Sequence, residues 1–268
     1  MSLFLLSPSA QPFPDPFPDG AFLLVDKPLA WTSFDVVNKI RYHLKRRLGV
    51  KKLKVGHAGT LDPLATGLLV ICVGSYTKRI DEFQALPKTY TGTITFGATT
   101  PSFDLEKAVN ATFPTAHLTA ALLQEARHQF VGDILQVPPV FSAVKVDGKR
   151  LYKNARTGEE VELPHRSVQV ESFELGQLRP VTAGRMEMIV AYDKGGAPIM
   201  LHPDYAQGVQ CDFECTCGKG TYIRSLANDL GQAVGSGAYL NALRRTQTGG
   251  FSVENAWEMD SLLDWLTG

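Results

Sequence analysis

Cysteine is scarce in this sequence: four residues in a chain of 268. A chain of this length with so few thiols does not carry a disulfide framework. Cys211, Cys215 and Cys217 alternate with polar residues, which predicts a strand with thiols on its apolar face. At ~3.3 Å per residue, Cys211 and Cys217 lie roughly 20 Å apart along such a strand. One zinc ion holds its sulfurs at about 2.3 Å, so these two cannot share one. We expect packed, reduced thiols in a cytoplasmic protein without a metal site.

The sequence also lacks a long apolar run. No segment reaches the ~20 apolar residues that a membrane-spanning helix needs, so we expect no membrane partner. Met1–Leu6 is apolar but has neither a basic lead nor an h-region, which excludes a secretory signal. Residues 7–20 carry five prolines, which predicts a disordered or strapped-down tail. We therefore expect a proline-rich tail at residues 1–20 and one globular domain at residues 21–268.

The sequence also has no net charge, since its 27 basic residues equal its 27 acidic residues in number. This balance counts against nucleic acid as a partner, but the distribution of charge counts for it. No acid occurs between Asp35 and Asp62, and eight of the basic residues fall there together with two histidines: Lys39, Arg41, His43, Lys45, Arg46, Arg47, Lys51, Lys52, Lys54 and His57. A charge run is usually a solvated helix face. An unbalanced run that leads into a glycine-rich loop fits contact with phosphate groups better.

The glycine-rich loop is Gly56–Gly59, and a lone acid, Asp62, follows it. Glycines allow a backbone to approach a ligand closely. An acid on such a loop, beside the apolar run Leu68–Val73, is a candidate nucleophile or base. Alternatively, Asp62 only caps a helix or forms a turn, because Asp-Pro favours turns. Residue types alone leave both interpretations open. The apolar run has the length of a buried strand or of a short core helix.

The order of secondary structure along the rest of the chain predicts an α+β domain. Strands are expected at residues 21–26, 90–95, 140–146, 168–173, 186–192 and 210–217. Helices are expected after the capping box of Thr32 and Asp35, from Pro114, at Leu151–Arg156, and around residues 223–230 and 262–266. The strands at 186–192 and 210–217 predict a hairpin with a long loop, Asp193–Gly208. Strands and helices do not alternate throughout, which favours α+β over a doubly wound sheet.

The loop sequence GHAGTLDPLATGLL, from Gly56, resembles the signature of the bacterial tRNA pseudouridine-55 synthases, the TruB family. Five more segments resemble this family in the same order: Phe22–Ser33, Lys88–Gly97, Val137–Arg156, Gly218–Gly231 and Gly237–Thr246. Together the segments span most of residues 21–257. The resemblance implies the pseudouridine synthase fold, a mixed and mostly antiparallel sheet flanked by helices, with residues 21–268 as the catalytic domain.

The resemblance implies an isomerase that acts on the uridine at position 55 in the T loop of tRNA. The C1′–N1 bond breaks, the free uracil turns, and the bond re-forms through C5, without a metal or cofactor. The uridine must first be flipped out of its loop, which costs a few kcal/mol. The implied partner is the T arm of tRNA, and we expect the chain to act as a monomer.

Three residues match the catalytic positions of the family. Asp62 supplies the carboxylate near C1′ and C6, and Arg224 is the cation that pairs with it. Tyr90 stacks on the target base and is a candidate acceptor of the C5 proton. By residue type alone, Arg224 is a surface arginine at the start of a helix and Tyr90 packs its ring within a strand.

Five further residues match positions that bind the substrate: His57, Tyr222, Leu243, Lys27 and Lys219. The resemblance places His57 against RNA near the flipped base, makes Tyr222 a second pocket tyrosine, and brings Leu243 against the target nucleotide. Lys27 and Lys219 are implied phosphate contacts. By character alone, His57 is a hydrogen-bonded loop histidine and Leu243 is a core leucine.

The chain departs from the family pattern in three places. About twenty residues follow Thr246, too few for the C-terminal PUA domain of many members. The Asp193–Gly208 loop looks like an insertion, and the proline-rich tail is extra. We expect these differences to change RNA affinity and substrate orientation rather than the chemistry.

Two other functions compete with this interpretation. A non-catalytic RNA-binding protein could use Gly56–Gly59 as a backbone clamp of the KH type, but such a clamp needs no Asp62, Tyr90 or Arg224. A hydrolase of glycosidic bonds usually needs paired carboxylates. The acids nearest to Asp62 in the sequence are Asp35 and Asp81, which gives it no close partner there.

Overall fold

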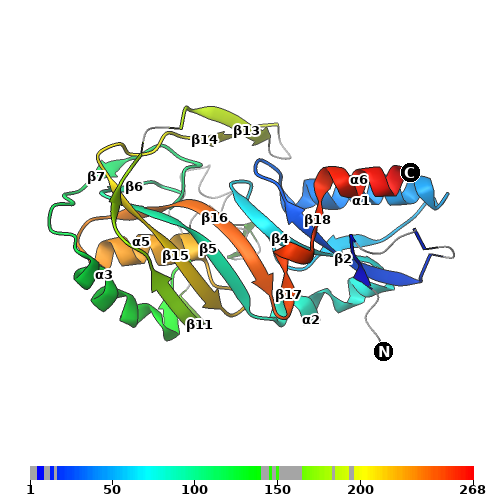
Figure 1. Cartoon of the computed structure of the whole chain (residues 1–268), viewed down its shortest axis with the longest axis horizontal. Helices are drawn as coiled ribbons and strands as arrows, with labels where there is room; N and C mark the ends of the chain where they lie inside the picture. Colours follow the sequence, from blue (N-terminus) through cyan, green and yellow to red (C-terminus); the bar gives the residue numbers. More distant parts are fainter. Residues whose placement is uncertain are drawn as a thin grey trace. The chain divides into compact units, whose positions relative to one another are not determined.

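The structure is a computed structural model that describes residues 5–8, 13–14, 17–139, 165–182, 185–192 and 196–268, and the backbone alone at 145–146 and 149–150. The chain divides into two compact units. Unit 1 comprises Met1–Tyr90, Val190–Ala197 and Arg244–Gly268, and unit 2 comprises Thr91–Ile189 and Pro198–Leu243. Strands β5 (Lys88–Phe96) and β16 (Ala238–Thr248) contribute residues to both units (Figure 1).

Unit 1 is built on β2 (Gly20–Lys27), which is buried along almost its whole length. It pairs antiparallel with β4 (Ala65–Gly74) and parallel with two short strands, β1 (Leu5–Leu6) and β18 (Trp257–Glu258). Strand β3 (Val55–His57) pairs antiparallel with β4. The predicted strand at residues 21–26 is confirmed, and the apolar run Leu68–Val73 is a buried strand rather than a helix.

The two faces of β2 serve two apolar clusters, because successive side chains of a strand point to opposite sides. Ala21, Leu23 and Val25 pack with α1 (Ser33–Arg47) and α6 (Met259–Thr267). Phe22 and Leu24 pack in the cluster that includes α2 (Ile80–Ala85). Helices α1 and α6 lie side by side in Figure 1 and contact each other. The sheet of unit 1 is therefore covered on both faces.

Helix α1 begins with the predicted capping box. The Thr32 hydroxyl accepts from the Asp35 backbone N–H at 3.1 Å, and the Asp35 carboxylate accepts from the Thr32 N–H at 2.9 Å. Gly49 follows the helix with a φ of 64°, a conformation typical of the residue after a helix C-terminus. The apolar side chains of Val36, Val37, Ile40 and Leu44 are buried along one stripe, whereas Leu48 at the end of the helix is only partly buried. The basic residues of α1 are therefore left off the buried stripe.

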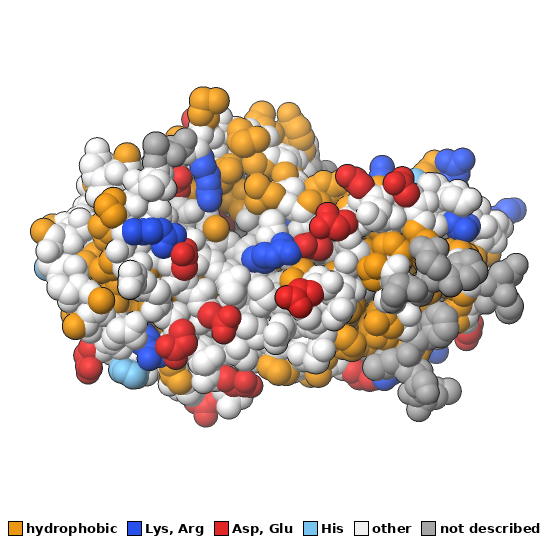
Figure 2. All heavy atoms as spheres, viewed as in Figure 1, with side chains coloured by type: hydrophobic (Ala, Val, Ile, Leu, Met, Phe, Trp, Pro, Cys, Tyr) orange, Lys and Arg blue, Asp and Glu red, His pale blue; other side chains and the backbone are white. Residues whose placement is uncertain are grey.

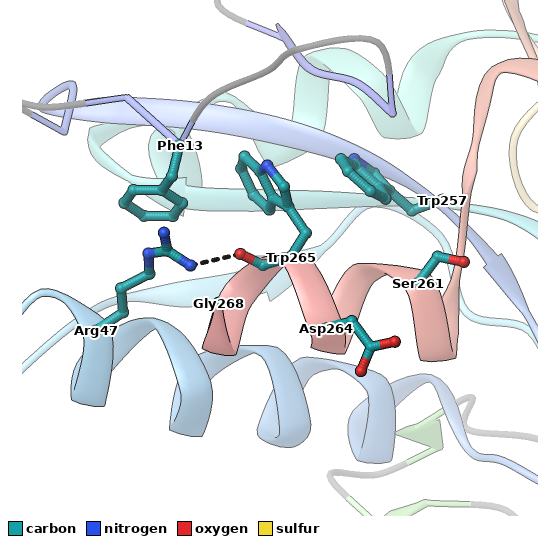
Figure 3. Close-up of a pocket in the computed structure, with 7 residues that line it drawn as sticks. All are labelled: Phe13, Arg47, Trp257, Ser261, Asp264, Trp265 and Gly268. Atoms are coloured by element: carbon teal, nitrogen blue, oxygen red, sulfur yellow. Dashed lines mark hydrogen bonds between the residues drawn. The ribbon is translucent and has the colours of Figure 1, made fainter.

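The N-terminal tail is strapped down where the structure describes it. The Trp257 indole N–H donates to the Leu6 carbonyl at 2.9 Å. The Phe13 ring lies 5.0 Å from the Trp265 ring and 4.1 Å from the Arg47 guanidinium, which donates to the Trp265 carbonyl at 2.5 Å (Figure 3). The hollow in Figure 3 is lined by Phe13, Arg47, Trp257, Ser261, Asp264, Trp265 and Gly268. None of the predicted site residues lines it.

Unit 2 contains an antiparallel ladder of β8 (Gly132–Gln136), β11 (Arg166–Leu175) and β15 (Val209–Cys217). Strand β12 (Arg179–Pro180) pairs with β15, and β6 (Ala98–Thr99) pairs with β7 (Ala111–Thr112). Helices α3 (Ala120–Arg127) and α5 (Ile223–Ala233) contact each other. The remaining short elements among the described residues are β9 (Lys145–Val146), β10 (Lys149–Arg150), β13 (Met188–Tyr192), β14 (Pro198–Leu201), β17 (Phe251–Ser252) and 3₁₀ turns at Ser75–Arg79, His128–Phe130 and Val253–Asn255.

Two predictions for this part of the chain are wrong. Helix α3 begins at Ala120 instead of Pro114, because Thr119 caps it by accepting from the Leu122 N–H at 3.1 Å. Strand β15 does not form the predicted hairpin with residues 186–192, since it pairs with β11 and β12 instead. Strand β14 lies inside the segment expected to be a loop. The predicted helix at Leu151–Arg156 and the predicted strand up to residue 144 fall outside the described residues.

The four cysteines are buried and form no disulfide bond. Burial raises the pKa of Cys72 and of Cys211 to about 12, so both thiols stay protonated near neutral pH. Within the described ranges, no group of histidine, cysteine and acidic side chains could hold a metal ion. No helix in this part of the chain is long and apolar enough to cross a membrane. The predicted α+β class with a mixed, mostly antiparallel sheet is confirmed.

Candidate active site

The loop that carries Asp62 is fastened on both sides by elements of unit 1. His57 ends β3 opposite Ile71 of β4, and the Ala58 N–H donates to the Val70 carbonyl at 2.9 Å. On the other side, the Leu61 N–H donates to the Ser33 hydroxyl at 2.8 Å, which donates back to the Leu61 carbonyl at 2.9 Å. Since Ser33 is the first residue of α1, the start of this helix holds the residue next to Asp62.

Asp62 itself occupies a turn. Its carbonyl accepts from the Ala65 N–H at 3.0 Å, and β4 begins at Ala65. The Pro63 carbonyl accepts from the Ala30 N–H at 3.0 Å, which ties the turn to the segment after β2. The helix-cap interpretation of Asp62 is therefore wrong, whereas its backbone does form the turn that Asp-Pro favours. The side chain is partly exposed, so it is within reach of a ligand.

Arg245 on β16 supports the same loop from inside the protein. It is only 1 % exposed, and its guanidinium donates to the Leu68 carbonyl at 2.6 Å and to the Gly59 carbonyl at 3.1 Å. Gly67 and Gly59 both have a φ of 100°. A Cβ on Gly67 would lie 2.2 Å from the Arg245 carbonyl oxygen, and one on Gly59 would lie 3.4 Å from its guanidinium. The glycines of this loop therefore let the backbone close around Arg245.

Sequence reasoning missed Arg245. Its two carbonyl partners lie 177 and 186 residues away along the chain, so no local pattern indicates them. The resembling segment Gly237–Thr246 contains Arg245, but there only Leu243 was singled out. The available signal was an arginine in a strand that also carries buried apolar residues, which requires a buried partner for its charge.

Lys27 corrects a prediction. It has 0 % exposure, and its ammonium donates to the carbonyls of Pro28 at 2.8 Å and Trp31 at 2.6 Å. A side chain buried in this way does not meet an RNA phosphate, so its assignment as a phosphate contact is wrong. Burial lowers the pKa of Lys27 to about 8, and attraction to the negative charge of Asp62 is the largest opposing effect. Asp62 therefore lies close enough to Lys27 for its negative charge to favour the protonated amine.

His57 lies on the same loop in a partly buried position. Burial lowers the pKa of its imidazole, the positive charge of Arg245 lowers it further, and a hydrogen bond with the Gly59 backbone opposes both. Its Nδ1 atom is buried without a hydrogen-bond partner among the described residues. His57 is therefore held as a neutral imidazole, and its contact with RNA stays a prediction.

Tyr90 lies at the start of β5, next to the strand that carries Arg245. The Thr246 hydroxyl of β16 donates to the Thr89 carbonyl at 3.2 Å, and the Gly249 N–H donates to the Pro87 carbonyl at 2.8 Å. These bonds fix the strand on which Tyr90 is half-buried. Unit 1 thus holds Asp62, His57, Lys27 and Tyr90 on segments tied to one another by hydrogen bonds.

In unit 2, a tight turn carries two of the other predicted residues, Lys219 and Tyr222. Strand β15 ends at Cys217, and Gly218–Tyr222 leads into α5. The side chain of Gln136, which is 2 % exposed, accepts from the Tyr222 N–H at 2.7 Å and donates to its carbonyl at 3.0 Å. Tyr222 is half-buried, and Lys219 on the turn is exposed. Lys219 therefore has the accessibility that a phosphate contact needs.

Arg224, in the first turn of α5, is buried, so its interpretation as a surface arginine is wrong. Its guanidinium donates to the Ser102 carbonyl at 3.1 Å and forms an ion pair with Asp104 at 3.6 Å, the two side chains being 6 % and 7 % exposed. Asp104 sits in a tight segment in which Phe103 has a φ of 61°. Sequence reasoning missed Asp104. Leu243 is half-buried on β16 and is not the fully buried core leucine that its character suggests.

Comparison with known proteins identifies the family. Residues 45–196 match the family model described as TruB family pseudouridylate synthase (N terminal domain), and residues 224–267 match the tRNA pseudouridylate synthase B C-terminal domain. The chain is 48 % identical over 255 residues to tRNA pseudouridine synthase B of Phocaeicola vulgatus, covering 93 % of this chain and 94 % of that protein. It is 47 % identical over 244 residues to tRNA pseudouridine synthase B of Flavobacterium johnsoniae, covering 91 % and 94 %.

A solved structure supports the fold. The chain superposes on a protein of a Cbf5-Nop10-Gar1 complex with a TM-score of 0.60 and 24 % identity, covering 96 % of this chain and 59 % of that one. At this identity the likeness shows the fold alone. With the two family models and the relatives that match over nearly their full length, it confirms the predicted fold and enzyme class. The chain belongs to the TruB family of pseudouridylate synthases, which are isomerases.

Proposed function

We propose that this enzyme converts the uridine at position 55 in the T loop of tRNA to pseudouridine. The observation that carries the proposal is the loop around Asp62. Ser33 and Arg245 hold its backbone, and the one acid of the loop stays partly exposed. The relatives named above, tRNA pseudouridine synthases B, support tRNA as the substrate.

The reaction moves one glycosidic bond. The bond between C1′ and N1 breaks, the uracil turns within the site, and a bond forms between C1′ and C5. The C5 proton is then lost, and N1 ends protonated, so the product is an isomer of the uridine. We propose Asp62 as the carboxylate that acts on the nucleotide. Tyr90 stacks on the base and is a candidate acceptor of the C5 proton.

Arg224 is the proposed cationic partner of the Asp62 carboxylate. Its burial and its ion pair with Asp104 fix the guanidinium in unit 2, as such a role requires. Lys27 adds a second positive charge, since Asp62 acts on its pKa within unit 1. We propose that residues 21–268 form one catalytic domain, which acts as a monomer without a metal or cofactor.

The target uridine must leave its loop before it reacts. Flipping costs a few kcal/mol, which stacking and edge hydrogen bonds recover. We propose His57, Tyr222 and Leu243 as the side chains that receive the flipped nucleotide, and Lys219 as a phosphate contact. The four buried cysteines without a disulfide bond fit a cytoplasmic enzyme that works on tRNA there.

The test is turnover by the Asp62→Asn variant. A tRNA transcript should gain one pseudouridine per molecule, at position 55, with the wild type and none with the variant. Binding of the same tRNA should change by less than about tenfold, because only the reacting group is altered. Asp81→Asn, at an exposed acid of α2, is the matched control and should keep wild-type turnover.

Three results would contradict the proposal. Turnover by a pure Asp62→Asn sample would remove Asp62 from catalysis. Product at another uridine would remove the assignment of position 55. Tight binding of tRNA by the wild type without any turnover would favour the non-catalytic RNA-binding protein.

A further inference from the structure

The solvent side of α1 carries a row of cations. Lys39 and Arg46 are exposed, and with His43 between them they follow the spacing i, i+4 and i+7 that places residues on one side of a helix. The Arg46 guanidinium lies 5.6 Å from the ring of the exposed Tyr42 and donates to its hydroxyl at 3.0 Å. A phenol satisfies a hydrogen bond but leaves the positive charge uncompensated.

The cations of this region lack the carboxylate partners that several arginines elsewhere in the described residues have. In the part of the chain that the structure describes, no carboxylate forms an ion pair with Arg46 or with any of the five lysines Lys39, Lys45, Lys51, Lys52 and Lys54. Four arginines elsewhere each form an ion pair: Arg79 with Glu82, Arg127 with Glu174, Arg179 with Asp212 and Arg244 with Asp26. In Figure 2, blue side chains towards the right-hand edge, where α1 ends in Figure 1, stand apart from red ones.

One acid lies nearby, but it is engaged. Asp35, four residues before Lys39, accepts from the backbone N–H of Thr32 at 2.9 Å and from its hydroxyl at 2.6 Å. Arg47 is also engaged, because it donates to the Trp265 carbonyl and lies over the Phe13 ring. The free cations are therefore those on the side of α1 that α6 does not cover.

The position of this row relative to the catalytic loop follows from helix geometry. Ser33 begins α1 and is hydrogen-bonded to Leu61, next to Asp62. At ~1.5 Å per residue, Lys39 lies roughly 9 Å and Arg46 roughly 20 Å along the helix from that anchor. Arg46, at the far end of the row, is therefore too far along the helix to touch a nucleotide at Asp62. RNA that meets them must extend several nucleotides away from the flipped base.

We propose that the Lys39–His43–Arg46 row of α1, continued by Lys51 and Lys52, binds the phosphate backbone of the RNA stem beside the target loop. This rests on the proposed function. A duplex backbone presents negative charge at regular spacing over this length, and an unpaired cationic row is complementary to it. The contact is to phosphates, so it positions the RNA without reading its sequence.

The protonation of His43 offers a second way to detect this contact. Burial, Lys39 and Arg46 all lower the pKa of its imidazole, so it is neutral near pH 7 in the free protein. The other charged or titratable side chains on the elements packed against α1 are Asp260, Asp264 and His57, and no described carboxylate forms an ion pair with His43. A phosphate beside His43 would favour its charged form. Binding is then coupled to proton uptake and strengthens as pH falls from 8 to 6.

The experiment measures the affinity of a T-arm hairpin at several salt concentrations. For the Lys39→Gln/Arg46→Gln variant, the slope of log K against log salt should fall by about 2, since each lost phosphate contact removes about 0.9. The matched control is Arg79→Gln/Arg179→Gln, which removes the same charge from two paired arginines. It should change the slope by less than about 0.5 and keep wild-type turnover. His43→Gln should remove most of the gain in affinity between pH 8 and pH 6.

The outcomes separate this proposal from the function on which it rests. Absence of turnover by the wild type overturns the proposed function. Turnover with an unchanged salt slope in the α1 variant overturns the α1 contact alone. A single-stranded T-loop RNA should show no difference in slope between wild type and variant, and an equal difference would move the contact from the stem to the loop. Loss of binding to phosphatidylserine vesicles without loss of RNA binding would assign the row to a membrane surface and overturn the proposal.

Discussion

Unit 1 and unit 2 bury their cations in different ways. In unit 1, Arg245 and Lys27 donate to backbone carbonyls. In unit 2, Arg224 forms an ion pair with the buried carboxylate of Asp104. A carbonyl satisfies the hydrogen bonds of a cation and leaves its charge in place, whereas a carboxylate also compensates the charge.

This difference indicates that the buried cations of unit 1 and the buried Arg224 of unit 2 have different roles. In unit 1 the charge of the Lys27 ammonium lies near the loop that carries Asp62, because the charges of Asp62 and Arg245 both act on the pKa of Lys27. In unit 2 the carboxylate of Asp104 fixes the position of Arg224. Its negative charge also cancels part of the electrostatic field of the guanidinium. The buried cations of unit 1 thus keep their positive charge, whereas in unit 2 the ion pair with Asp104 fixes the position of the Arg224 guanidinium. The predictions below remove one partner at a time.

The largest effect is expected from Arg245→Ala. The variant leaves a cavity and removes the donor of the Leu68 and Gly59 carbonyls, which should lower the free energy of unfolding by ~5 kcal/mol. Turnover should fall at least about 100-fold, because the loop with Asp62 loses its support. Urea unfolding and turnover of tRNA measure the two quantities. Arg244→Ala, at a half-exposed neighbour paired with Asp26, should lower the unfolding free energy by about 1 kcal/mol or less. Equal stability of the two variants would show that Arg245 does not support the loop.

Asp104→Asn is expected to have the next largest effect. The variant replaces the carboxylate that pairs with Arg224 by a neutral amide. Removing the charge of one partner in a buried ion pair lowers the free energy of unfolding by ~4 kcal/mol. The exposed pair of Arg179 and Asp212 provides the control, since Asp212→Asn should cost about 0.5 kcal/mol. A double-mutant cycle with Arg224→Met should show that the two losses are not additive. Additive losses would separate Asp104 from Arg224.

The smallest effect concerns the pH dependence of Lys27. Its pKa of about 8 in the folded protein is below the value of 10.5 that an exposed lysine has. Between these values the unfolded chain binds more protons, so the stability of the wild type rises with pH, by at most ~3 kcal/mol. Lys27→Met should lack this rise in urea midpoints between pH 7.5 and 10.5, and Lys39→Met, at an exposed lysine, should retain it. A wild-type stability that stays flat over this range would mean that burial does not shift the pKa of Lys27.

Predictions from sequence were correct where neighbouring residues decide the structure. The capping box of Thr32 and Asp35 spans four residues, and the buried strand at Leu68–Val73 is one apolar run. The alternation of Cys211, Cys215 and Cys217 likewise predicts buried thiols on β15. The start of α3 was missed although its signal is local. Pro114 is a strong helix-start signal, but the cap that forms is Thr119.

The support of the site was less predictable because its partners are distant in sequence. Arg245 holds carbonyls near residues 59 and 68, and Arg224 pairs with an acid 120 positions away. The resemblance indicated Asp62, Tyr90 and Arg224 as reacting groups. It did not indicate Asp104, nor that Lys27 is enclosed by Pro28 and Trp31.

The way in which unit 1 is closed has a consequence for its synthesis on the ribosome. Its core combines Leu6, Val25 and Val36 with Trp257 and Leu262. Strands β1 and β18 both add to β2, and the Trp257 indole binds the Leu6 carbonyl. Domains tend to fold as their chains emerge, beginning at the N-terminus. Here β1, β2 and α1 are synthesised first, but their core is completed only when residues 257–266 have left the exit tunnel. Until then β2 stays partly uncovered. A pause late in translation therefore prolongs the exposure of the apolar side chains of β2.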